Sequence, residues 1–424
     1  MKRNEAIYTA IDIGSSKITT LMAHFNMDGN LEIMGVGTVN SSGIHKGIVK
    51  DEIKLSEDIR VSLDAACISS GVKSTPAFIG LTGGKLSSYN VTSATSRISQ
   101  PDQRVSQAEL SSIIHDTVPL IPDSTEDSLV QVISRGYTID GIRTHQSPIG
   151  RKVNELSVDS HVVLAKKATL ETIMQCVRQG GATICGMTLE SIASSCSVLS
   201  ADEKELGVVL VDIGGGTTDI AIFQEGSILH SSSIPVGGYH LTNDIAISCR
   251  TTIEAAEEAK VRFGNVGPNV IENEKINMPS RSGSDVLTIE SSEICDLLRD
   301  RMSETLVLVM GKIRRAGLHR PPAAGIVFTG GTAKLPGLLS LSEEISQCSA
   351  RIGIPKYIGQ MPEYMADPSY ATSTGLLLWG VHSYGKDKTV VIKEDVNKSM
   401  VNIIRKNLFH IPFLKNFNAS NTPK

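Results

Sequence analysis

Apolar and polar positions follow the same order in the two halves of the chain, and this order predicts two strand-rich domains. Each half opens with two apolar runs separated by a short polar or glycine-rich turn, as in a hairpin of buried strands. The strands predicted for the first half are 7–13, 18–24, 31–39 and 76–84. The second half has a strand–turn–strand unit at 207–223, a third strand near 227–234, and a strand, glycine turn and helix at 323–338.

Helices are predicted where apolar residues recur every three or four positions. One of them, 53–71, ends at Gly71, and glycine suits a left-handed helix C-terminus. Another begins at Gly238, and a T-x-x-E capping box at Thr251 and Glu254 is expected to open the next helical segment. The remaining helices are 167–181, 189–199, about 291–316 and 370–380, with a polar turn at 201–206 and a loop or small hairpin at 264–285.

The segment 85–165 differs from both halves in composition, because Ser, Thr and Gln are abundant in it. Strands at 128–134 and 159–164 and a helix at 105–115 are predicted within it. We interpret it as a subdomain inserted into the first domain. The predicted units are 1–84 and 166–204 (first domain), 85–165 (inserted subdomain), 205–384 (second domain, with a smaller lobe at about 240–320), 385–398 (charged linker) and 399–417 (amphipathic helix).

The end of the chain has its own pattern. Residues 386–424 contain eight Lys and Arg against three Asp and Glu, although the whole chain has a net charge of −4. Within 399–417, apolar residues recur at helical spacing beside basic ones, which is typical of a helix lying in a membrane interface, where anionic lipids attract the bases. Pro412 is expected to kink or stop this helix, and docking of the tail onto the body or a partner is the alternative. The residues expected at the membrane are Met400, Val401, Ile404, Arg405, Lys406, Leu408, Ile411, Phe413, Leu414 and Phe417.

Composition agrees with a globular protein of several packing units. The chain has 424 residues, of which 40% are hydrophobic and 20% charged. Its seven cysteines are scattered and form no C-x-x-C, which argues against a disulfide framework or zinc site and fits a reducing cytosol. No signal peptide is expected, because Asp12 precedes any long apolar run, and no transmembrane helix is expected, because no apolar stretch approaches 18 residues.

The two turns suit the binding of phosphate. Each follows an aspartate near the end of a strand, Asp12 in AIDIGSSK and Asp212 in VDIGGGTTD. Glycines let the backbone approach a ligand, and successive N–H groups can form an anion-binding nest. Two facing turns could hold the phosphates of a nucleotide, with the carboxylates holding Mg²⁺ largely through water and Lys17 adding a positive charge. The alternative is that the turns only close hairpins; neither has Walker A spacing.

With these two turns, the sequence resembles the actin, Hsp70 and sugar-kinase superfamily. The resemblance rests on five segments in the superfamily's order. They are the first phosphate hairpin (10–18), a connecting helix (186–199), the second phosphate hairpin (208–223), an adenosine loop (325–338) and a second connecting helix (370–380). It implies an α/β, two-domain actin-like fold with ATP and Mg²⁺ in the interdomain cleft.

The resemblance also assigns roles to individual residues. The residues implied to bind nucleotide are Asp12, Gly14, Ser15, Ser16, Lys17, Asp212, Gly214, Gly215, Gly216, Thr217, Thr218, Gly238, Glu257, Lys260, Gly330, Gly331 and Thr332, with Asp12 and Asp212 at the metal. Glu257 and Lys260 correspond to ribose and adenine contacts, although locally they are an ordinary (i, i+3) surface pair. Glu190 corresponds to the side chain that orients the attacking water, and a solvated helix residue is the alternative.

The insert and the tail make the whole chain similar to the bacterial division actins of the FtsA family. That likeness implies a membrane-tethered, ATP-binding filament with at most weak ATPase activity, located on the cytoplasmic face of the inner membrane at the septum. The implied partners are the FtsZ C-terminal peptide, other copies of the chain, later division proteins and membrane lipids; no nucleic acid is expected. Many tails along one filament would bind membrane with avidity.

In that family the smaller lobe of the second domain receives the FtsZ peptide. Basic residues on its last predicted helix are candidates for an acidic peptide, although solvation of the helix surface explains each of them separately: Arg299, Arg301, Arg314 and Arg315. Two rival functions remain, a small-molecule kinase of the same superfamily and an actin-like component of type IV pilus assembly. A kinase needs a catalytic base beside an acceptor pocket, which we do not find, and the tail has no evident use in such an enzyme. The pilus component shares the insert but usually lacks a linker and tail, so the tail argues against it.

Overall fold

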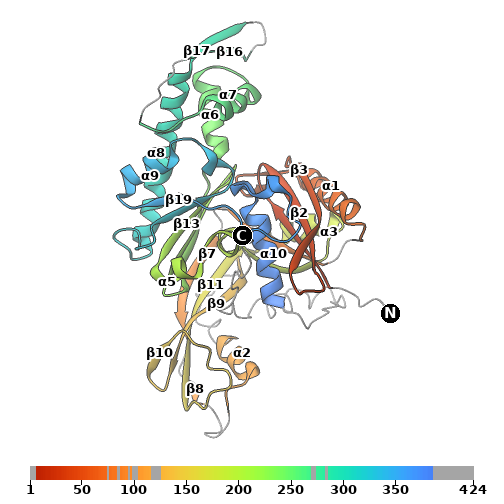
Figure 1. Cartoon of the computed structure of the whole chain (residues 1–424), viewed down its shortest axis with the longest axis vertical. Helices are drawn as coiled ribbons and strands as arrows, with labels where there is room; N and C mark the ends of the chain where they lie inside the picture. The colour runs from red at the N-terminus through yellow and green to blue at the C-terminus, as the bar shows by residue number, and fades with distance from the viewer. Residues whose placement is uncertain are drawn as a thin grey trace, which may run out of the picture.

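The computed structural model describes residues 6–73, 76–83, 86–93, 96–97, 104–115, 126–268, 274–281 and 285–384. In Figure 1 the first domain lies on one side of a central helix and the second domain on the other. A hairpin-bearing lobe extends from the second domain at the top of the view, and the inserted subdomain extends at the bottom. The predicted linker and tail lie outside the described residues. Within the residues the structure describes, no helix combines the length and hydrophobicity needed to span a bilayer.

The first domain is built on a five-stranded sheet. Its order is β12-β6-β1-β2-β3, with β1, β2 and β3 antiparallel to one another in turn and β1, β6 and β12 parallel. The strands are β1 Ile7–Ile13, β2 Lys17–Phe25, β3 Leu31–Asn40, β6 Ala77–Leu81 and β12 Ile184–Leu189. Helices α1 (Glu52–Ser70) and α3 (Lys167–Gln179) pack against each other beside this sheet.

The second domain repeats this plan. Its sheet has the order β15-β14-β13-β18-β19, again with two antiparallel pairings followed by two parallel ones. The strands are β13 Val208–Ile213, β14 Thr218–Gln224, β15 Ser227–Ile234, β18 Ile326–Thr329 and β19 Ala350–Ile352. The repeated phrase in the sequence is therefore the first hairpin of each sheet. Both hairpins read as continuous apolar runs because both faces of their strands are covered.

Two short helices cross where the domains meet. Helix α4 (Glu190–Val198) follows β12, and α10 (Ala371–Tyr384) follows the last loop of the second domain. They approach so closely that a Cβ atom on Gly375 would overlap the carbonyl of Ala193. The hydroxyl of Ser197 donates to the carbonyl of Ala371 (2.7 Å), so the crossing is fixed by packing and by a hydrogen bond.

The inserted subdomain has its own core and sheet. Its sheet order is β10-β9-β11-β7, with β8 paired to β11. The elements are β7 Leu86–Thr92, β8 Ser96–Arg97, α2 Gln107–His115, β9 Asp127–Ile139, β10 Ile142–Thr144 and β11 Glu155–Lys166. It packs against β15, the edge strand of the second sheet. There the side chain of Ser88 donates to the carbonyl of Ser231 (2.8 Å) and that of Asn90 donates to the carbonyl of Leu229 (2.9 Å).

The upper lobe and the remaining elements complete the fold. The lobe consists of α6 Gly238–Ser248, α7 Ile253–Phe263, β16 Lys275–Pro279, β17 Val286–Glu290 and α8 Ser291–Arg315, with α9 Leu338–Ser346 packed on α8. The short elements are β4 Ile44–His45, β5 Ile48–Val49, α5 Ala201–Leu206, and the 3₁₀ turns η2 Gly331–Lys334, η3 Glu363–Met365 and η4 Pro368–Tyr370.

Three local predictions were wrong. Residues 186–189 belong to β12 and not to the connecting helix, because this apolar stretch adds a parallel strand to β6. The predicted capping box at Thr251 and Glu254 does not open α7, since the N-cap is Thr252, whose hydroxyl accepts from the N–H of Ala255. The expected polar turn at 201–206 is helix α5, with a capping box formed by Ser200 and Glu203.

Candidate functional site

The two predicted turns are closed by the same hydrogen bond. The N–H of Gly14 donates to the carbonyl of Lys17 (3.1 Å), and the N–H of Gly214 donates to the carbonyl of Thr217 (2.9 Å). Equal spacing and equal closure make the turns structural copies of each other. The repeat in the sequence therefore extends to the backbone of the site.

The tips of the two turns face each other in contact. A Cβ atom on Gly216 would lie 2.5 Å from Oγ of Ser15, and one on Gly215 would overlap the hydroxyl of Ser16. Only glycine lets the second turn approach the first this closely. The structure thus brings together two turns that lie about 200 positions apart in the sequence.

The backbone of both turns leaves donors free for a ligand. Among the residues that the structure describes, no hydrogen bond uses the N–H groups of Ser15, Ser16, Gly215 and Gly216. The carbonyls of Gly214 and Gly215 point elsewhere, because they accept from the N–H groups of Gly238 (2.9 Å) and Tyr239 (2.7 Å) in the first turn of α6. Free N–H groups with withdrawn carbonyls are the backbone arrangement that can accept an anion.

Asp12 and Asp212 occupy matching positions in β1 and β13. Both are buried, with 8% and 6% of their surface exposed. The Oδ2 atom of Asp212 accepts from Ser194 on α4 (2.5 Å) and from Thr372 on α10 (2.9 Å). Both crossing helices therefore hold the second carboxylate in place.

Burial dominates the protonation of this pair. It raises the pKa of Asp12 to about 7; the ammonium of Lys17 lowers this pKa, and the carboxylate of Asp212 raises it further. Burial also raises the pKa of Asp212, against the hydrogen bonds from Ser194 and Thr372. Two interacting buried carboxylates are costly when both are charged, and a cation beside them removes that cost.

Glu190 lies next to these carboxylates as the first residue of α4. Its side chain is buried, and its Oε1 atom has no hydrogen-bond partner among the described residues. Burial raises its pKa, and the charges of Asp12, Asp219 and Asp212 raise it further. Gly80 makes room for this side chain, since a Cβ there would lie 2.8 Å from Cγ of Glu190. The alternative of a solvated helix residue is wrong.

Asp219 and Thr82 belong to the site although sequence reasoning missed them. The register of the second hairpin places Asp219 opposite Asp212, and this register was the signal in VDIGGGTTD that could have revealed it. Asp219 accepts from Thr82 at the end of β6 (2.6 Å) and from Thr217 (3.0 Å). Burial raises its pKa to about 6. The contact with Thr82 joins the two domains.

Lys17 forms no ion pair with any described residue. Its Nζ atom donates to the hydroxyl of Ser369 (3.1 Å) and lies 3.4 Å from the ring centroid of Tyr370, where a cation–π attraction holds it. Burial lowers its pKa, while Asp12 and Asp367 raise it. Lys17 therefore lies beside the first turn with no carboxylate partner among the described residues.

Glu257 and Lys260 are more than a solvated surface pair. Their ion pair (2.7 Å) connects to α6, because Nζ of Lys260 also donates to Thr242 (2.9 Å) and to the carbonyl of Gly238 (3.3 Å). Thr242 in turn donates to the same oxygen of Glu257. Glu257 and Lys260 therefore form the expected (i, i+3) pair, and Lys260 also ties α7 to α6.

The third glycine-rich loop, at 330–332, contacts the second turn although it follows that turn by more than 100 positions in the chain. The hydroxyl of Thr332 donates to the carbonyl of Gly214 (3.1 Å) and lies where a Cβ on Gly238 would be 2.5 Å away. Gly330 has a φ of 86°, and a side chain there would overlap Asp212. Gly331 begins η2. Thr218, the last predicted contact, is buried in β14 and donates to the carbonyl of Val236 (2.8 Å).

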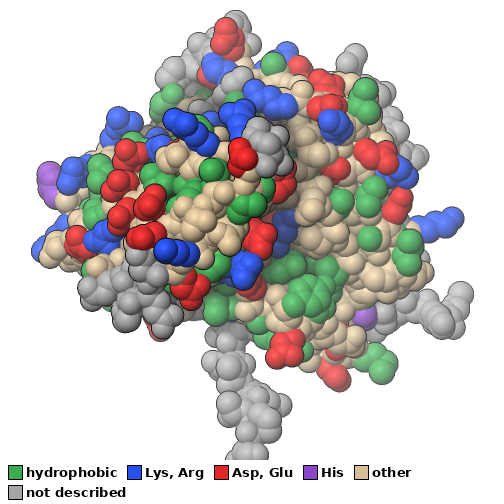
Figure 2. Space-filling model, turned by 90° about the horizontal axis from the view of Figure 1, so that it is seen from above, with side chains coloured by type: hydrophobic (Ala, Val, Ile, Leu, Met, Phe, Trp, Pro, Cys, Tyr) green, Lys and Arg blue, Asp and Glu red, His purple; other side chains and the backbone are tan. Residues whose placement is uncertain are grey.

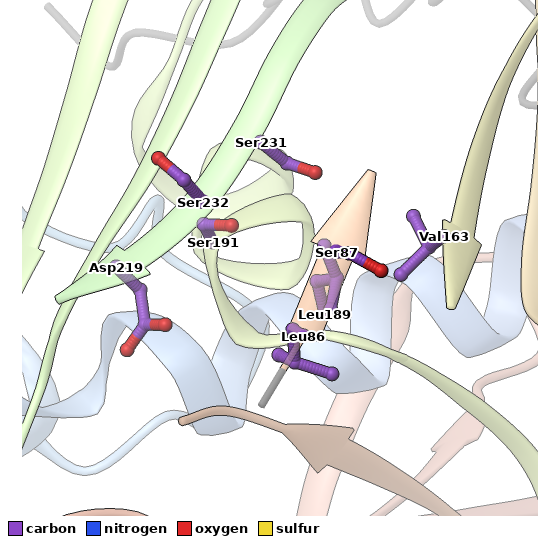
Figure 3. Close-up of a pocket in the computed structure, with 8 residues that line it drawn as sticks. All are labelled: Leu86, Ser87, Val163, Leu189, Ser191, Asp219, Ser231 and Ser232. Atoms are coloured by element: carbon purple, nitrogen blue, oxygen red, sulfur yellow. The ribbon is translucent and has the colours of Figure 1, made fainter. Parts of the chain in front are cut away.

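A small cavity lies beside the site. Figure 3 shows it between the inserted subdomain, α4 and the second sheet; its lining residues are Leu86, Ser87, Val163, Leu189, Ser191, Asp219, Ser231 and Ser232. In this view the carboxylate of Asp219 points away from the hydroxyls of Ser231 and Ser232. The turns do not line the cavity, which shares only Asp219 with the residues of the site described above.

The four arginines proposed for an acidic peptide do not form one patch. Arg299 pairs with Glu344 (2.8 Å) on α9, and Arg301 pairs with Asp244 (2.6 Å) on α6. Arg314 and Arg315 are exposed at the other end of α8. Figure 2, which looks down on the molecule from above, shows acidic and basic side chains intermingled over the upper face.

Comparison with known proteins places the chain in a family. The family model described as "Cell division protein FtsA" matches residues 209–375, and the model of the SHS2 domain inserted in FtsA matches residues 83–164. The cell division protein FtsA of Pseudomonas aeruginosa is 34% identical over 372 residues, which cover 88% of this chain and 88% of that protein. The chain belongs to the FtsA family. As a member of the FtsA family it is an actin-like cell-division protein.

Solved structures support the fold of this FtsA-family chain. The type IV pilus biogenesis complex PilM–PilN contains a chain with a TM-score of 0.64 and 17% identity, covering 89% of this chain and 99% of that one. MreB5 of Spiroplasma citri, solved bound to ADP, has a TM-score of 0.51 and 16% identity, covering 87% and 94%. At this identity the likeness shows the fold alone. The predicted two-domain actin-like fold with an FtsA-type insert is confirmed.

Proposed function

We propose that this chain binds Mg²⁺ and ATP between its two domains, polymerises, and anchors the FtsZ ring to the cytoplasmic face of the membrane at the division site. In this proposal it also recruits later division proteins. The observation that carries the proposal is the pair of facing turns with free backbone N–H groups, flanked by two buried carboxylates. Anionic phosphates satisfy the first feature and a cation the second.

The residues present fit a nucleotide. The free N–H groups and Lys17 suit the phosphates. On the other side of Gly214, a polar cluster suits the ribose and base. That cluster consists of Gly238, Glu257, Lys260, Gly330, Gly331 and Thr332.

The residues present also fit a hydrated divalent cation. Asp12 and Asp212 are buried and interact electrostatically, and the carboxylate of Glu190 has an unpartnered buried oxygen. No group of three or more His, Cys, Asp or Glu side chains within the described ranges is arranged to ligate a metal directly. Mg²⁺ commonly keeps several waters and needs few protein ligands. Asp12 and Asp212 would hold such an ion, which when bound neutralises phosphate charge.

We assign to this site at most a slow hydrolysis. Glu190 would orient the attacking water, and its pKa is raised by burial and by the charges of Asp12, Asp219 and Asp212. In this proposal the filament assembles with nucleotide bound, so its structural role does not depend on a fast reaction.

The basis for membrane attachment is the sequence 399–417. A single short amphipathic helix binds a bilayer only marginally. Tails displayed along a filament gain effective concentration, so polymerisation would switch membrane binding on. An acidic FtsZ peptide would meet the upper lobe at Arg314 and Arg315, because Arg299 and Arg301 already have acidic partners.

One sedimentation experiment tests these elements together. The full chain is mixed with Mg·ATP and vesicles containing anionic lipid, beside Asp212→Ala and a chain lacking 399–424. We expect the wild type to pellet with vesicles, the truncated chain to remain soluble, and Asp212→Ala to pellet less because it binds no nucleotide. Equal sedimentation of the truncated chain would refute the anchor, and unchanged ATP affinity of Asp212→Ala in calorimetry would refute the site.

A further inference from the structure

The hairpin β4–β5 lies across the two phosphate turns and touches both domains. It belongs to the first domain, where the N–H of Gly47 donates to the hydroxyl of Ser15 (3.2 Å). It reaches the second domain at two points: the ring of His45 packs edge-on against Tyr239 of α6 (4.7 Å between centroids), and a Cβ on Gly216 would lie 2.8 Å from Cα of Lys46. The tip of this hairpin therefore sits directly on the tip of the second turn.

Lys46 occupies the tip in an unusual conformation. His45 pairs with Ile48, so the loop has two residues, Lys46 and Gly47, with φ values of 53° and 67°. Two-residue hairpin loops with positive φ at both positions prefer Asn-Gly or Asp-Gly. A lysine in the left-handed region costs conformational energy that asparagine largely avoids. The local turn therefore does not explain the choice of lysine.

The ammonium of Lys46 has no acidic partner among the residues that the structure describes. Lys46 is half-buried, and no described residue forms an ion pair with it. Its charge acts across the cleft: burial lowers the pKa of His240 in α6, and Lys46 lowers it further. With Lys17, it is the second cation at the turns without a carboxylate partner among the described residues.

The position of Lys46 along the second turn indicates which phosphate it would meet. Gly214 lies at one end, where its carbonyl accepts from Thr332 and Gly238 on the side assigned to ribose and base. Gly216 lies at the other end, against Lys46. A nucleotide stretched along the turn would place its last phosphate at the end occupied by Lys46.

We infer that Lys46 binds the terminal phosphate of the nucleoside triphosphate and makes the site distinguish ATP from ADP. This inference rests on the proposed function, because it assumes that the cleft takes a nucleotide. A charge-assisted hydrogen bond to phosphate strengthens binding by about tenfold to a hundredfold. That contribution would be absent for a diphosphate.

The substitution Lys46→Asn tests the role of the ammonium without destabilising the turn. It removes the ammonium and installs the Asn-Gly sequence that this loop prefers, so the variant should unfold at or above the wild-type temperature. Lys46→Arg keeps the charge. Lys50→Asn, at an exposed position just after β5, is the matched control.

Calorimetry of the full chain with Mg·ATP and with Mg·ADP gives the result. We expect Lys46→Asn to weaken Mg·ATP binding by about tenfold to a hundredfold and Mg·ADP binding by less than about threefold. Lys46→Arg and Lys50→Asn should behave like the wild type. Wild-type ATP affinity in Lys46→Asn, or equal losses for ATP and ADP, would overturn the inference. A wild-type chain that binds neither nucleotide would instead overturn the proposed function, and this inference with it.

Discussion

Replacing Asp12 with asparagine should stabilise the ligand-free protein at alkaline pH. Asp12 is buried, and its pKa is raised from 3.8 to about 7 by burial, by Asp212 and against Lys17. The folded state binds this proton more tightly than the unfolded state. The free energy of unfolding therefore has its full contribution from protonated Asp12 below about pH 4 and loses it as the pH rises to about 7. The amide of the Asp12→Asn variant cannot ionise, so the variant should not show this loss.

The size of the effect follows from the shift. A displacement of about three pKa units corresponds to on the order of 4 kcal/mol between the two protonation states. The asparagine amide is itself a buried polar group, so part of the gain is offset. The variant also relieves Glu190, whose pKa the charge of Asp12 raises. We therefore expect Asp12→Asn to exceed the wild type by a few kcal/mol at pH 8 and to lose most of this advantage at pH 4.

Urea unfolding of the chain without Mg²⁺ or nucleotide, measured from pH 4 to pH 8, checks this expectation. Asp202→Asn, at an exposed position on α5, is the control for loss of a carboxylate without burial. An Asp12→Asn variant that is less stable than the wild type at pH 8, or a wild-type stability that does not fall between pH 4 and pH 8 relative to the variant, would refute the reasoning. Adding Mg·ATP should reverse the order, because only the wild type retains both carboxylates.

Two further predictions concern the contacts between the domains. Gly375→Ala should lower the free energy of unfolding by about 1–3 kcal/mol in a thermal-unfolding assay, since the new methyl group would overlap the carbonyl of Ala193. The control Gly311→Ala on α8 meets nothing within 4 Å and should be neutral or stabilising. Equal effects of the two substitutions would contradict the close crossing of α4 and α10. Thr82→Val should lower the free energy of unfolding by about 1 kcal/mol, because it removes the hydrogen bond to Asp219. A double-mutant cycle with Asp219→Asn should show coupling, and strictly additive effects would rule out the contact.

The sequence predicted the two hairpins because their pattern is local. A buried strand, an aspartate and a run of small residues are adjacent in the chain, and neighbouring residues decide whether they form a turn. The same holds for α1, whose end at Gly71 is fixed by one residue with a φ of 70°. It fails for β12, because an apolar stretch becomes a strand or a helix according to its neighbour, and β6 is about 100 positions away.

The candidate site divides in the same way. Sequence alone determined that two acid-tipped turns exist, that they are copies, and that an insert at 85–165 divides the first domain. Only the tertiary structure decided that the tips touch, that Thr372 and Ser194 hold Asp212, that Thr82 meets Asp219, and that Arg299 and Arg301 already have acidic partners. Hydrogen bonds and ion pairs of this kind join residues far apart in the chain, so their formation depends on how two folded domains pack, which no local pattern encodes.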